Sequence, residues 1–261
     1  MNRIQQLFER QQGDILNIYC TAGYPQLEDT TRIIVELDKA GANIIELGMP
    51  YSDPLADGPT IQASSSVALD NGMSIKVLFD QLEDIRSQSQ LPIILMGYLN
   101  PVLQYGMKAF LERCQAVGID GLILPDLPLY EYENDYQSLF EQYGLSMIFL
   151  ITPQTSEARI RKIDALSNAF IYIVSTAATT GKQAGFGAEN IAYFERIKAL
   201  QLKNPTLIGF GISRAVDYHT VCQYSNGAIV GSAFIRMLGQ SQDLPNDIQQ
   251  FVHDLRQPVS V

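Results

Sequence analysis

The sequence has few of the residues on which many enzymes build their chemistry. It holds only two histidines, His219 and His253, and both lie in segments with helical spacing. A histidine-based metal site or a catalytic triad is therefore not expected. The three cysteines, Cys20, Cys114 and Cys222, are odd in number and far apart in the chain. They indicate reduced thiols in a cytoplasmic protein and not a disulfide framework or a zinc site.

Positive charge is also scarce. The formal net charge is −10 and no run of Lys and Arg occurs, so nucleic acid and anionic membranes are poor candidate partners. None of the seven lysines lies on an apolar strand-like segment, where burial would activate it for Schiff-base chemistry. No stretch approaches the ~18 apolar residues of a membrane helix, and the N-terminal segment lacks the apolar core of a secretory signal.

Short apolar runs alternate along the chain with longer amphipathic runs. The runs with strand character are Ile15–Thr21, Ile44–Gly48, Ile93–Gly97, Gly121–Leu124, Ser146–Ile151, Ala169–Val174, Thr206–Gly209 and Ala228–Gly231. Most of them are apolar without interruption, as strands buried on both faces are. The pattern therefore predicts eight buried strands.

The segments between these strands have helical spacing. They are Leu27–Lys39, Ile75–Arg86, Lys108–Cys114, Glu131–Gln142, Glu157–Ala165, Ala188–Ala199 and Ala215–Gln223, with Asp247–Leu255 after the last strand. Eight strand–helix units without a linker predict a (β/α)8 TIM barrel, formed as a single domain by residues 1–261. A doubly wound open sheet is the alternative, but no Gly-rich fingerprint follows the first strand.

The two ends of the chain lie outside this alternation. Residues 1–12 predict an extra helix whose apolar face, formed by Ile4, Leu7 and Phe8, could close the bottom of the barrel. Residues 257–261 resemble a frayed tail.

A carboxylate is expected to be buried at the end of the second strand. The strand neighbours of Glu46 are apolar, and a buried Glu costs several kcal/mol unless it is paired or functional. The loop that follows carries Asp53 and Asp57 between prolines and glycines. Such facing carboxylates suit acid–base chemistry without a metal. Asp53 could instead fix its own loop through an Asx turn, and Asp126 could cap the helix that follows it.

Glycines at three successive strand ends predict an anion site. Gly181, Gly211 and Gly231 allow backbone N–H groups to approach a phosphate closely, and Ser232 is expected to cap a short helix, Ala233–Leu238, whose N-terminus points at the site. Phosphate sites after the seventh and eighth strands recur in these barrels. The alternative is that the glycines only permit tight turns.

The other half of the expected site is apolar. The residues at these strand ends are Tyr19, Met96, Tyr98, Phe149, Tyr172 and Phe210. Together they suit a flat ring bound opposite the phosphate, although each could be an ordinary core residue.

On these motifs the chain resembles the α subunit family of tryptophan synthase. The resemblance rests on the segment Glu46-Leu-Gly-Met-Pro-Tyr-Ser-Asp-Pro-Leu-Ala-Asp-Gly-Pro-Thr-Ile-Gln62, followed by Pro125-Asp-Leu-Pro128, Gly209-Phe-Gly-Ile-Ser213 and Val230-Gly-Ser-Ala233. Their order and spacing cover essentially the whole chain. The resemblance implies a lyase of tryptophan biosynthesis that cleaves indole-3-glycerol phosphate to indole and glyceraldehyde 3-phosphate.

The resemblance also implies roles for individual residues. Glu46 is expected to be the general acid–base, Asp57 the second catalytic carboxylate and Tyr172 a helper near the substrate. The implied substrate-binding residues are Tyr19, Tyr98, Thr180, Gly181, Phe210, Gly211, Gly231 and Ser232. No cofactor or metal is implied in this chain. The implied partner is a pyridoxal-phosphate-dependent β subunit, which receives the indole in an α2β2 complex.

This chemistry also fits the residues themselves. A retro-aldol cleavage needs a base for the glycerol hydroxyl and a proton for indole C3, and Glu46 can supply both in turn if the apolar strand end raises its pKa. Protonation of C3 places positive charge on the ring nitrogen, which an ionised Asp57 facing that nitrogen would stabilise.

The sequence departs from the family pattern in the loop expected to close over the substrate. Ala178 stands where many members carry glycine, and the following segment Lys182–Gly187 is expected to be flexible. Tyr19 stands where Phe is common, which adds a polar group near the ring.

Other functions remain open from the sequence. A stand-alone lyase that releases free indole is not distinguished from a subunit in a complex. A related phosphate-sugar isomerase is disfavoured by the match at Asp53 and Asp57, and a catalytically dead binding subunit by intact Glu46 and Asp57. Tyr51, Pro54 and Leu55 could form an exposed partner surface or fold back onto the barrel.

Overall fold

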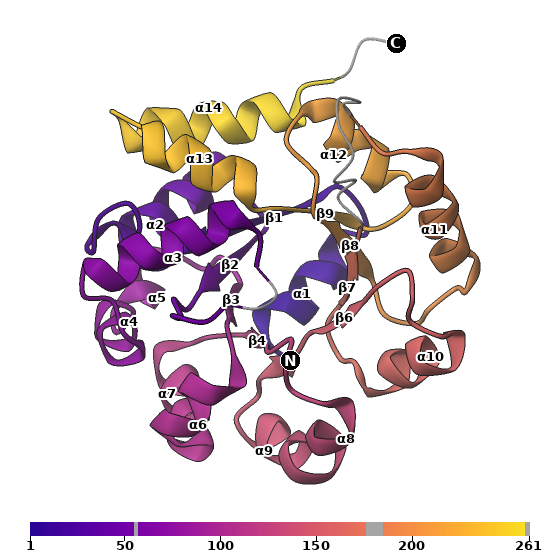
Figure 1. Cartoon of the computed structure of the whole chain (residues 1–261), viewed down its shortest axis with the longest axis horizontal. Coiled ribbons are helices and arrows are strands. Elements are labelled where there is room, and N and C mark those ends of the chain that lie inside the picture. The colour runs from indigo at the N-terminus through magenta and orange to yellow at the C-terminus, as the bar shows by residue number, and fades with distance from the viewer. Residues whose placement is uncertain (55–56, 176–184, 259–261) are drawn as a thin grey trace.

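A parallel sheet rolled into a barrel lies at the centre of the molecule (Figure 1). The computed structural model describes residues 1–54, 57–175 and 185–258. Within them the strands are β1 (Ile15–Thr21), β2 (Ile44–Gly48), β3 (Ile93–Met96), β4 (Gly121–Ile123), β5 (Ser146–Met147), β6 (Phe149–Ile151), β7 (Ile171–Val174), β8 (Thr206–Gly209) and β9 (Gly227–Val230). Their order in the sheet is β5-β4-β3-β2-β1-β9-β8-β7-β6.

The pairing of the strands confirms the predicted barrel. β1 pairs in parallel with both β2 and β9, so the first and last strands are neighbours, which a doubly wound open sheet does not allow. The single strand expected over Ser146–Ile151 is divided into β5 and β6, since β5 pairs with β4 whereas β6 pairs with β7. Ile148, between the two, still donates its N–H to the Leu122 carbonyl at 2.9 Å. The described strands therefore surround the barrel axis, and the pairing partner changes once, between β5 and β6.

Helices surround the strands on the outside, except the N-terminal helix, which lies across one end of the strands (Figure 1). Their bounds are α1 (Arg3–Arg10), α2 (Asp29–Ala40), α3 (Pro59–Asp70), α4 (Ile75–Gln81), α5 (Ile85–Gln88), α6 (Leu99–Tyr105), α7 (Met107–Val117), α8 (Leu129–Glu131), η1 (Tyr132–Tyr136, a π-helix), α9 (Gln137–Gln142), α10 (Glu157–Leu166), α11 (Ala188–Ala199), α12 (Ala215–Cys222), α13 (Ser232–Gln240) and α14 (Leu244–Arg256).

Two of these helices, α3 and α6, were not predicted. α3 reads Pro-Thr-Ile-Gln-Ala-Ser-Ser-Ser-Val-Ala-Leu-Asp, and its small polar residues give little apolar periodicity. It begins with Pro59 at the first helical position, where the missing N–H costs nothing. The expected helix Ile75–Arg86 is also broken, into α4 and α5.

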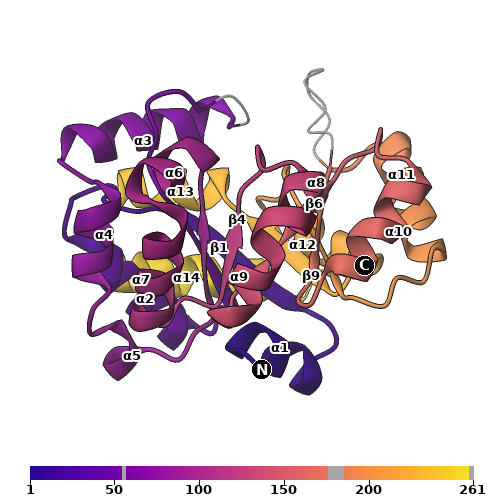
Figure 2. The same ribbon diagram turned by 90° about the horizontal axis from the view of Figure 1, so that it is seen from below.

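α1 closes the amino end of the barrel, as the sequence predicts. Ile4 is fully buried and Phe8 is 7% exposed, and both pack with inward-facing strand residues such as Ile15 and Ile44. The side chain of Asn2 accepts a hydrogen bond from the backbone N–H of Gln5 and caps the helix. Figure 2 shows α1 across one end of the strands. The opposite, carboxyl end is left for the site.

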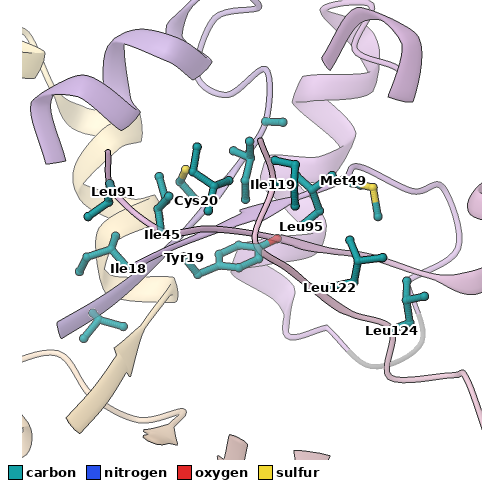
Figure 3. Packing of buried hydrophobic residues seen from close by; sticks show 14 of the residues in the cluster. Ile18, Tyr19, Cys20, Ile45, Met49, Leu91, Leu95, Ile119, Leu122 and Leu124 are labelled. Carbon is teal, nitrogen blue, oxygen red and sulfur yellow. The ribbon is translucent and has the colours of Figure 1, made fainter. Parts of the chain in front are cut away.

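The core has two layers, one on each face of the strands. The inner layer fills the barrel and includes Ile94, Ile123 and Leu207. The outer layer lies between strands and helices, and Figure 3 shows part of it, with Ile18, Cys20, Ile45, Leu95 and Leu122. Successive strand residues alternate between the layers, so the sequence position decides which side chains can reach the barrel axis.

Candidate active site

A cavity of about 330 Å³ lies at the carboxyl end of the barrel. Strands β1, β2, β3, β7 and β9 contribute to its wall, together with the turn after β8 and the first turns of α3 and α13. The lining residues are Tyr19, Glu46, Asp57, Gly58, Pro59, Ile61, Met96, Tyr172, Phe210, Gly211, Ile212, Ser213, Ile229, Gly231, Ser232, Ala233 and Arg236. Most of the residues predicted from the sequence thus line one cavity.

Glu46 lies at the inner wall of this cavity. It is fully buried, and burial raises the pKa of its carboxyl to about 8, although a hydrogen bond from Asn17 acts in the opposite direction. The Asn17 amide Nδ2 donates to Oε1 at 2.6 Å, whereas Oε2 has no hydrogen-bond partner among the described residues. At neutral pH the carboxyl is therefore mostly protonated and can act first as an acid.

Asn17 is a site residue that the sequence reasoning missed. It is the only amide in the apolar run Ile15–Thr21, and it is fully buried. The signal was the same as for Glu46, a polar side chain within a buried strand, and it applied equally to both residues.

Asp57 lies at the mouth of the cavity. It is half-buried, and partial burial raises the pKa of its carboxyl while a hydrogen bond from Tyr98 opposes the shift. The Tyr98 hydroxyl donates to Oδ2 of Asp57 at 3.2 Å, and the Tyr98 ring packs on Tyr51 with centroids 5.3 Å apart. Tyr98 therefore acts on the second carboxylate directly and holds the loop over the barrel.

The two tyrosines of the barrel interior are accommodated by glycines on neighbouring strands. A Cβ on Gly48 would lie 2.1 Å from the Tyr19 hydroxyl, and one on Gly209 would lie 2.3 Å from the Tyr172 hydroxyl. Burial raises the pKa of both phenols, with the nearby Asp57 adding to the shift of Tyr19 and Glu46 to that of Tyr172. Both side chains are therefore neutral at physiological pH and can donate hydrogen bonds but cannot act as bases.

The turn after β8 has an unusual backbone. Phe210 and Gly211 both adopt positive φ, 72° and 75°, and for a bulky residue such as Phe210 this conformation is uncommon. The buried Ser175 hydroxyl lies 2.9 Å from the Gly209 carbonyl and 2.8 Å from that of Phe210, so it holds the turn. Ser175 is a second supporting residue that the sequence reasoning did not single out.

α13 begins at the cavity wall, but not as predicted. Gly231 occupies the N-cap position and Ser232 is the first helical residue, so Ser232 is not the cap. The helix extends over Ser232–Gln240 and is longer than the expected Ala233–Leu238. Its first N–H groups have no partner within the helix and face the same cavity as Gly231, which suits an anion. Arg236, unnoticed in the sequence, borders this end of the cavity.

The other expected contributors differ in their placement. Phe149 packs against Tyr132 in the outer layer, with centroids 5.1 Å apart, so its assignment to the site is wrong. Its neighbour Leu150 packs with the inner layer instead, because strand residues alternate. Thr180 and Gly181, like Ala178, lie outside the described residues.

The remaining acidic residues have structural contacts. Asp53 is exposed and accepts a hydrogen bond from the Ser52 hydroxyl at 2.5 Å, which agrees with a local role. Asp126 accepts from the N–H of Leu99 at 2.9 Å, so it caps α6 of the preceding unit and not the helix that follows it. Of the segment considered as a partner surface, Tyr51 packs back on Tyr98, and Leu55 lies outside the described residues.

A larger hollow, about 670 Å³, lies at the amino end beside α1. Its buried carboxylate, Asp120, is already paired with Arg3 at 3.2 Å and Arg86 at 2.9 Å, and accepts from the N–H of Ile93. The buried carboxyl with an oxygen that lacks a partner among the described residues, that of Glu46, is thus at the other end. Among the described residues, no three His, Cys, Asp or Glu side chains are grouped as a metal site requires, and no helix is long and apolar enough to cross a membrane.

A parallel barrel with its titratable side chains gathered at the strand ends belongs to the class of (β/α)8-barrel enzymes that work by acid–base chemistry. The model of the family "Tryptophan synthase alpha chain" matches residues 5–259. The chain therefore belongs to the tryptophan synthase alpha chain family, and is a lyase subunit of tryptophan biosynthesis.

Individual relatives agree with this assignment. The chain is 55% identical to the tryptophan synthase alpha chain of Flavobacterium johnsoniae over 256 residues, which cover 98% of this chain and all of that one. It is also 55% identical to that of Christiangramia forsetii, over 92% of this chain and 94% of that one.

Solved structures give the same result. The alpha chain from Legionella pneumophila subsp. pneumophila has a TM-score of 0.88 at 32% identity, with 98% of this chain and 96% of that one covered. Tryptophan synthase from M. tuberculosis in an aminoacrylate-bound form has a TM-score of 0.85 at 28% identity, with 98% of each chain covered.

Proposed function

We propose that this chain, as a single barrel domain in the cytoplasm, cleaves indole-3-glycerol phosphate to indole and glyceraldehyde 3-phosphate. The observation that carries the proposal is Glu46, a buried carboxyl with a pKa of about 8 and one oxygen without a partner among the described residues, on the wall of the cavity. A group that is protonated at neutral pH and yet can ionise is suited to donate and then to accept a proton.

The reaction is assigned in three steps. Protonated Glu46 transfers its proton to indole C3, which places positive charge on the ring nitrogen. The resulting Glu46 carboxylate then removes the proton of the glycerol hydroxyl next to the scissile bond. The carbon–carbon bond breaks, its electron pair returns to the ring, and the new carbonyl becomes the aldehyde of glyceraldehyde 3-phosphate, while Glu46 is again protonated.

Asp57 stabilises the positive ring nitrogen in the intermediate. Its place at the mouth of the cavity, half-buried, allows a carboxylate to face the ring at reduced solvent screening. The neutral hydroxyl of Tyr172 donates a hydrogen bond to the substrate. The side chains of Tyr19, Tyr98 and Phe210 flank the indole ring.

The phosphate is assigned to the other end of the cavity. Gly211, Gly231 and Ser232 offer backbone N–H groups there, and the N-terminus of α13 adds its partial positive charge. Thr180 and Gly181 are proposed to complete this site. No cofactor is assigned to the chain itself.

A pyridoxal-phosphate-dependent β subunit is the proposed partner, in an α2β2 complex, with the pyridoxal phosphate in that subunit. Indole release should be assayed with and without added β subunit. In a complex the two proteins co-elute and the lyase rate changes; separate elution with an unchanged rate would support the stand-alone lyase.

The test of the catalytic assignment compares two carboxylate variants in this assay. Glu46→Gln is expected to remove nearly all cleavage while glycerol phosphate still binds, because the amide cannot exchange the proton. Asp57→Asn is expected to lower kcat more than it raises KM, because its charge matters in the intermediate. A near-normal rate for Glu46→Gln, or an effect of Asp57→Asn on KM alone, would contradict the roles.

A further inference from the structure

One hydrogen bond joins two polar side chains of the barrel interior, of which one lines the cavity and the other lies below it. Asn17 on β1 and Glu46 on β2 are both fully buried, and Nδ2 of Asn17 lies 2.6 Å from Oε1 of Glu46. Each side chain also has one oxygen, Oδ1 of Asn17 and Oε2 of Glu46, without a partner among the described residues.

The strand register shows from which side Asn17 approaches. Tyr19 is paired with Glu46, and Asn17 is paired with Ile44, so Asn17 lies two residues closer to the amino end of the barrel. Tyr19 and Glu46 line the cavity, whereas Asn17 does not. The amide therefore holds the carboxyl from the closed side of the barrel.

We propose that Asn17 is a positioning residue that fixes which oxygen of Glu46 exchanges protons with the substrate. Because Oε1 accepts the Asn17 hydrogen bond, the proton of the neutral carboxyl resides on Oε2, the oxygen left for the substrate. The inference rests on the proposed function and adds to it an assignment of the reacting atom.

Stability alone does not explain an asparagine at this position. An apolar residue in its place would pack in the inner layer with Ile15 and Ile44 and would bury no unpartnered oxygen. The cost of burying Oδ1 is consistent with a role of Asn17 in function, since polar groups that disturb a core occur at functional sites.

The other groups that face the carboxyl do not fix its orientation. They are the neutral phenols of Tyr19 on β1 and Tyr172 on β7, and Asp57 on the loop before α3. β3 presents the apolar Ile94 opposite Glu46. Arg236 borders the other end of the cavity. Among the described side chains, Asn17 alone donates a hydrogen bond to Glu46.

The experiment removes the amide and keeps the shape. Asn17→Leu retains the branch at the γ carbon, and Asn17→Val is a smaller second variant if the leucine overpacks the barrel. Without the hydrogen bond that favours the carboxylate, the pKa of Glu46 is expected to rise by roughly one unit or more. The high-pH limb of kcat/KM should shift upward by the same amount, and kcat should fall at least about tenfold with KM changed less than about threefold.

A matched control removes a buried threonine hydroxyl elsewhere in the barrel. Thr21 on β1 touches the site through the Tyr19 side chain, so Thr30→Val on α2 takes this place. Thr30 is buried and its hydroxyl accepts a hydrogen bond from the Gly23 N–H at 3.0 Å. Its loss removes a buried hydrogen bond that involves neither Glu46 nor a residue lining the cavity. This variant is expected to lose stability and to keep the native pH limb. A merely structural role for Asn17 predicts the same behaviour for the Asn17 variants.

A second readout does not depend on turnover. The infrared band of the protonated Glu46 carboxyl, identified by its absence in Glu46→Gln, can be titrated in the native protein and in both Asn17 variants. An unchanged titration and an unchanged pH limb would overturn the inference even if the native protein cleaves the substrate. A native protein that does not release indole would overturn the proposed function instead, while the infrared titration still reports on the pair.

Discussion

At the scale of single residues, burial is the main influence on the chemistry of the site. Glu46 is a carboxyl surrounded by apolar strands, and its pKa of about 8 follows from desolvation, the largest cause of the shift. The apolar neighbours of Glu46 in the sequence made this burial predictable. Its hydrogen bond to Asn17 was not, because residues 29 positions apart meet only through the register of β1 and β2.

The raised pKa of Glu46 should make the stability of the protein depend on pH. A folded-state pKa above the ordinary value of 4.5 means a stabilising contribution that is complete below about pH 4.5 and is lost as pH rises through about 8. Glu46→Gln removes this dependence. The free energy of unfolding of the variant, measured relative to that of the native protein, should therefore increase as pH rises across that range. At about 1.4 kcal/mol per unit, the gain is at most roughly 5 kcal/mol.

Urea unfolding of both proteins at pH 5, 7 and 9 checks this expectation. Glu9→Gln, which changes an exposed glutamate on α1, is the control and should follow the native protein at each pH. If the difference between Glu46→Gln and the native protein stays constant over this range, Glu46 does not titrate as inferred.

At the scale of elements, the sequence predicted best what apolar patterning determines. β1, β2, β8 and α11 have the predicted bounds, because their residues are distinctly apolar or amphipathic. The apolar periodicity of α3 is too weak to detect in the sequence, and the helix is stabilised by its packing against the barrel. The division of Ser146–Ile151 into β5 and β6 reflects a change of pairing partner, which no local pattern contains.

The same limit applies to the site. Phe149 was assigned to the cavity from its position near a strand end. Successive side chains of a strand point to opposite faces of the sheet, so an error of one residue in the assumed phase moves a side chain to the other face. Phe149 lies in the outer layer for this reason. Arg236 lies one helical turn into α13, so it reaches the cavity only because the chain becomes helical directly after Gly231.

Arg236 leads to a prediction about α13 as a phosphate-binding element. Its side chain is exposed, borders the cavity beside Ser232 and Ala233, and makes no ion pair with any residue in the described ranges. Arg236→Gln is therefore expected to weaken binding of inorganic phosphate and to raise KM roughly three- to tenfold, with a smaller change in kcat, because the charge acts on a group that does not react. The effect should decrease at high salt.

Calorimetric titration with phosphate at two ionic strengths measures this effect. Arg10→Gln makes the same charge change on α1, at the opposite end of the barrel, and should leave the affinity unchanged. Equal effects of the two variants would indicate that only the net charge of −10 matters and that Arg236 has no local role.

At the scale of the whole molecule, the two ends of the barrel have different tasks. The carboxyl end gathers polar side chains and remains open, whereas the amino end is closed by α1, which fills the barrel with Ile4 and Phe8. A Cβ on Gly121 of β4 would lie 3.2 Å from Cδ1 of Ile4, so the helix contacts the strands closely. The strands that carry the site are therefore supported by a core that α1 closes at the amino end.

Ile4→Ala tests this division. Ile4 is fully buried, and its truncation leaves a cavity at the barrel axis, so the free energy of unfolding should fall by about 2–4 kcal/mol. The kcat of the molecules that remain folded should change little, because the reacting groups lie at the other end. Val216→Ala, at a side chain of a residue that is 41% exposed on α12, should cost less than about 0.5 kcal/mol. If Ile4→Ala lowers the free energy of unfolding no more than Val216→Ala does, α1 only covers the barrel and contributes little to the core. If the kcat of the folded molecules also falls, by a factor that corresponds to the lost free energy, the two ends of the barrel are coupled.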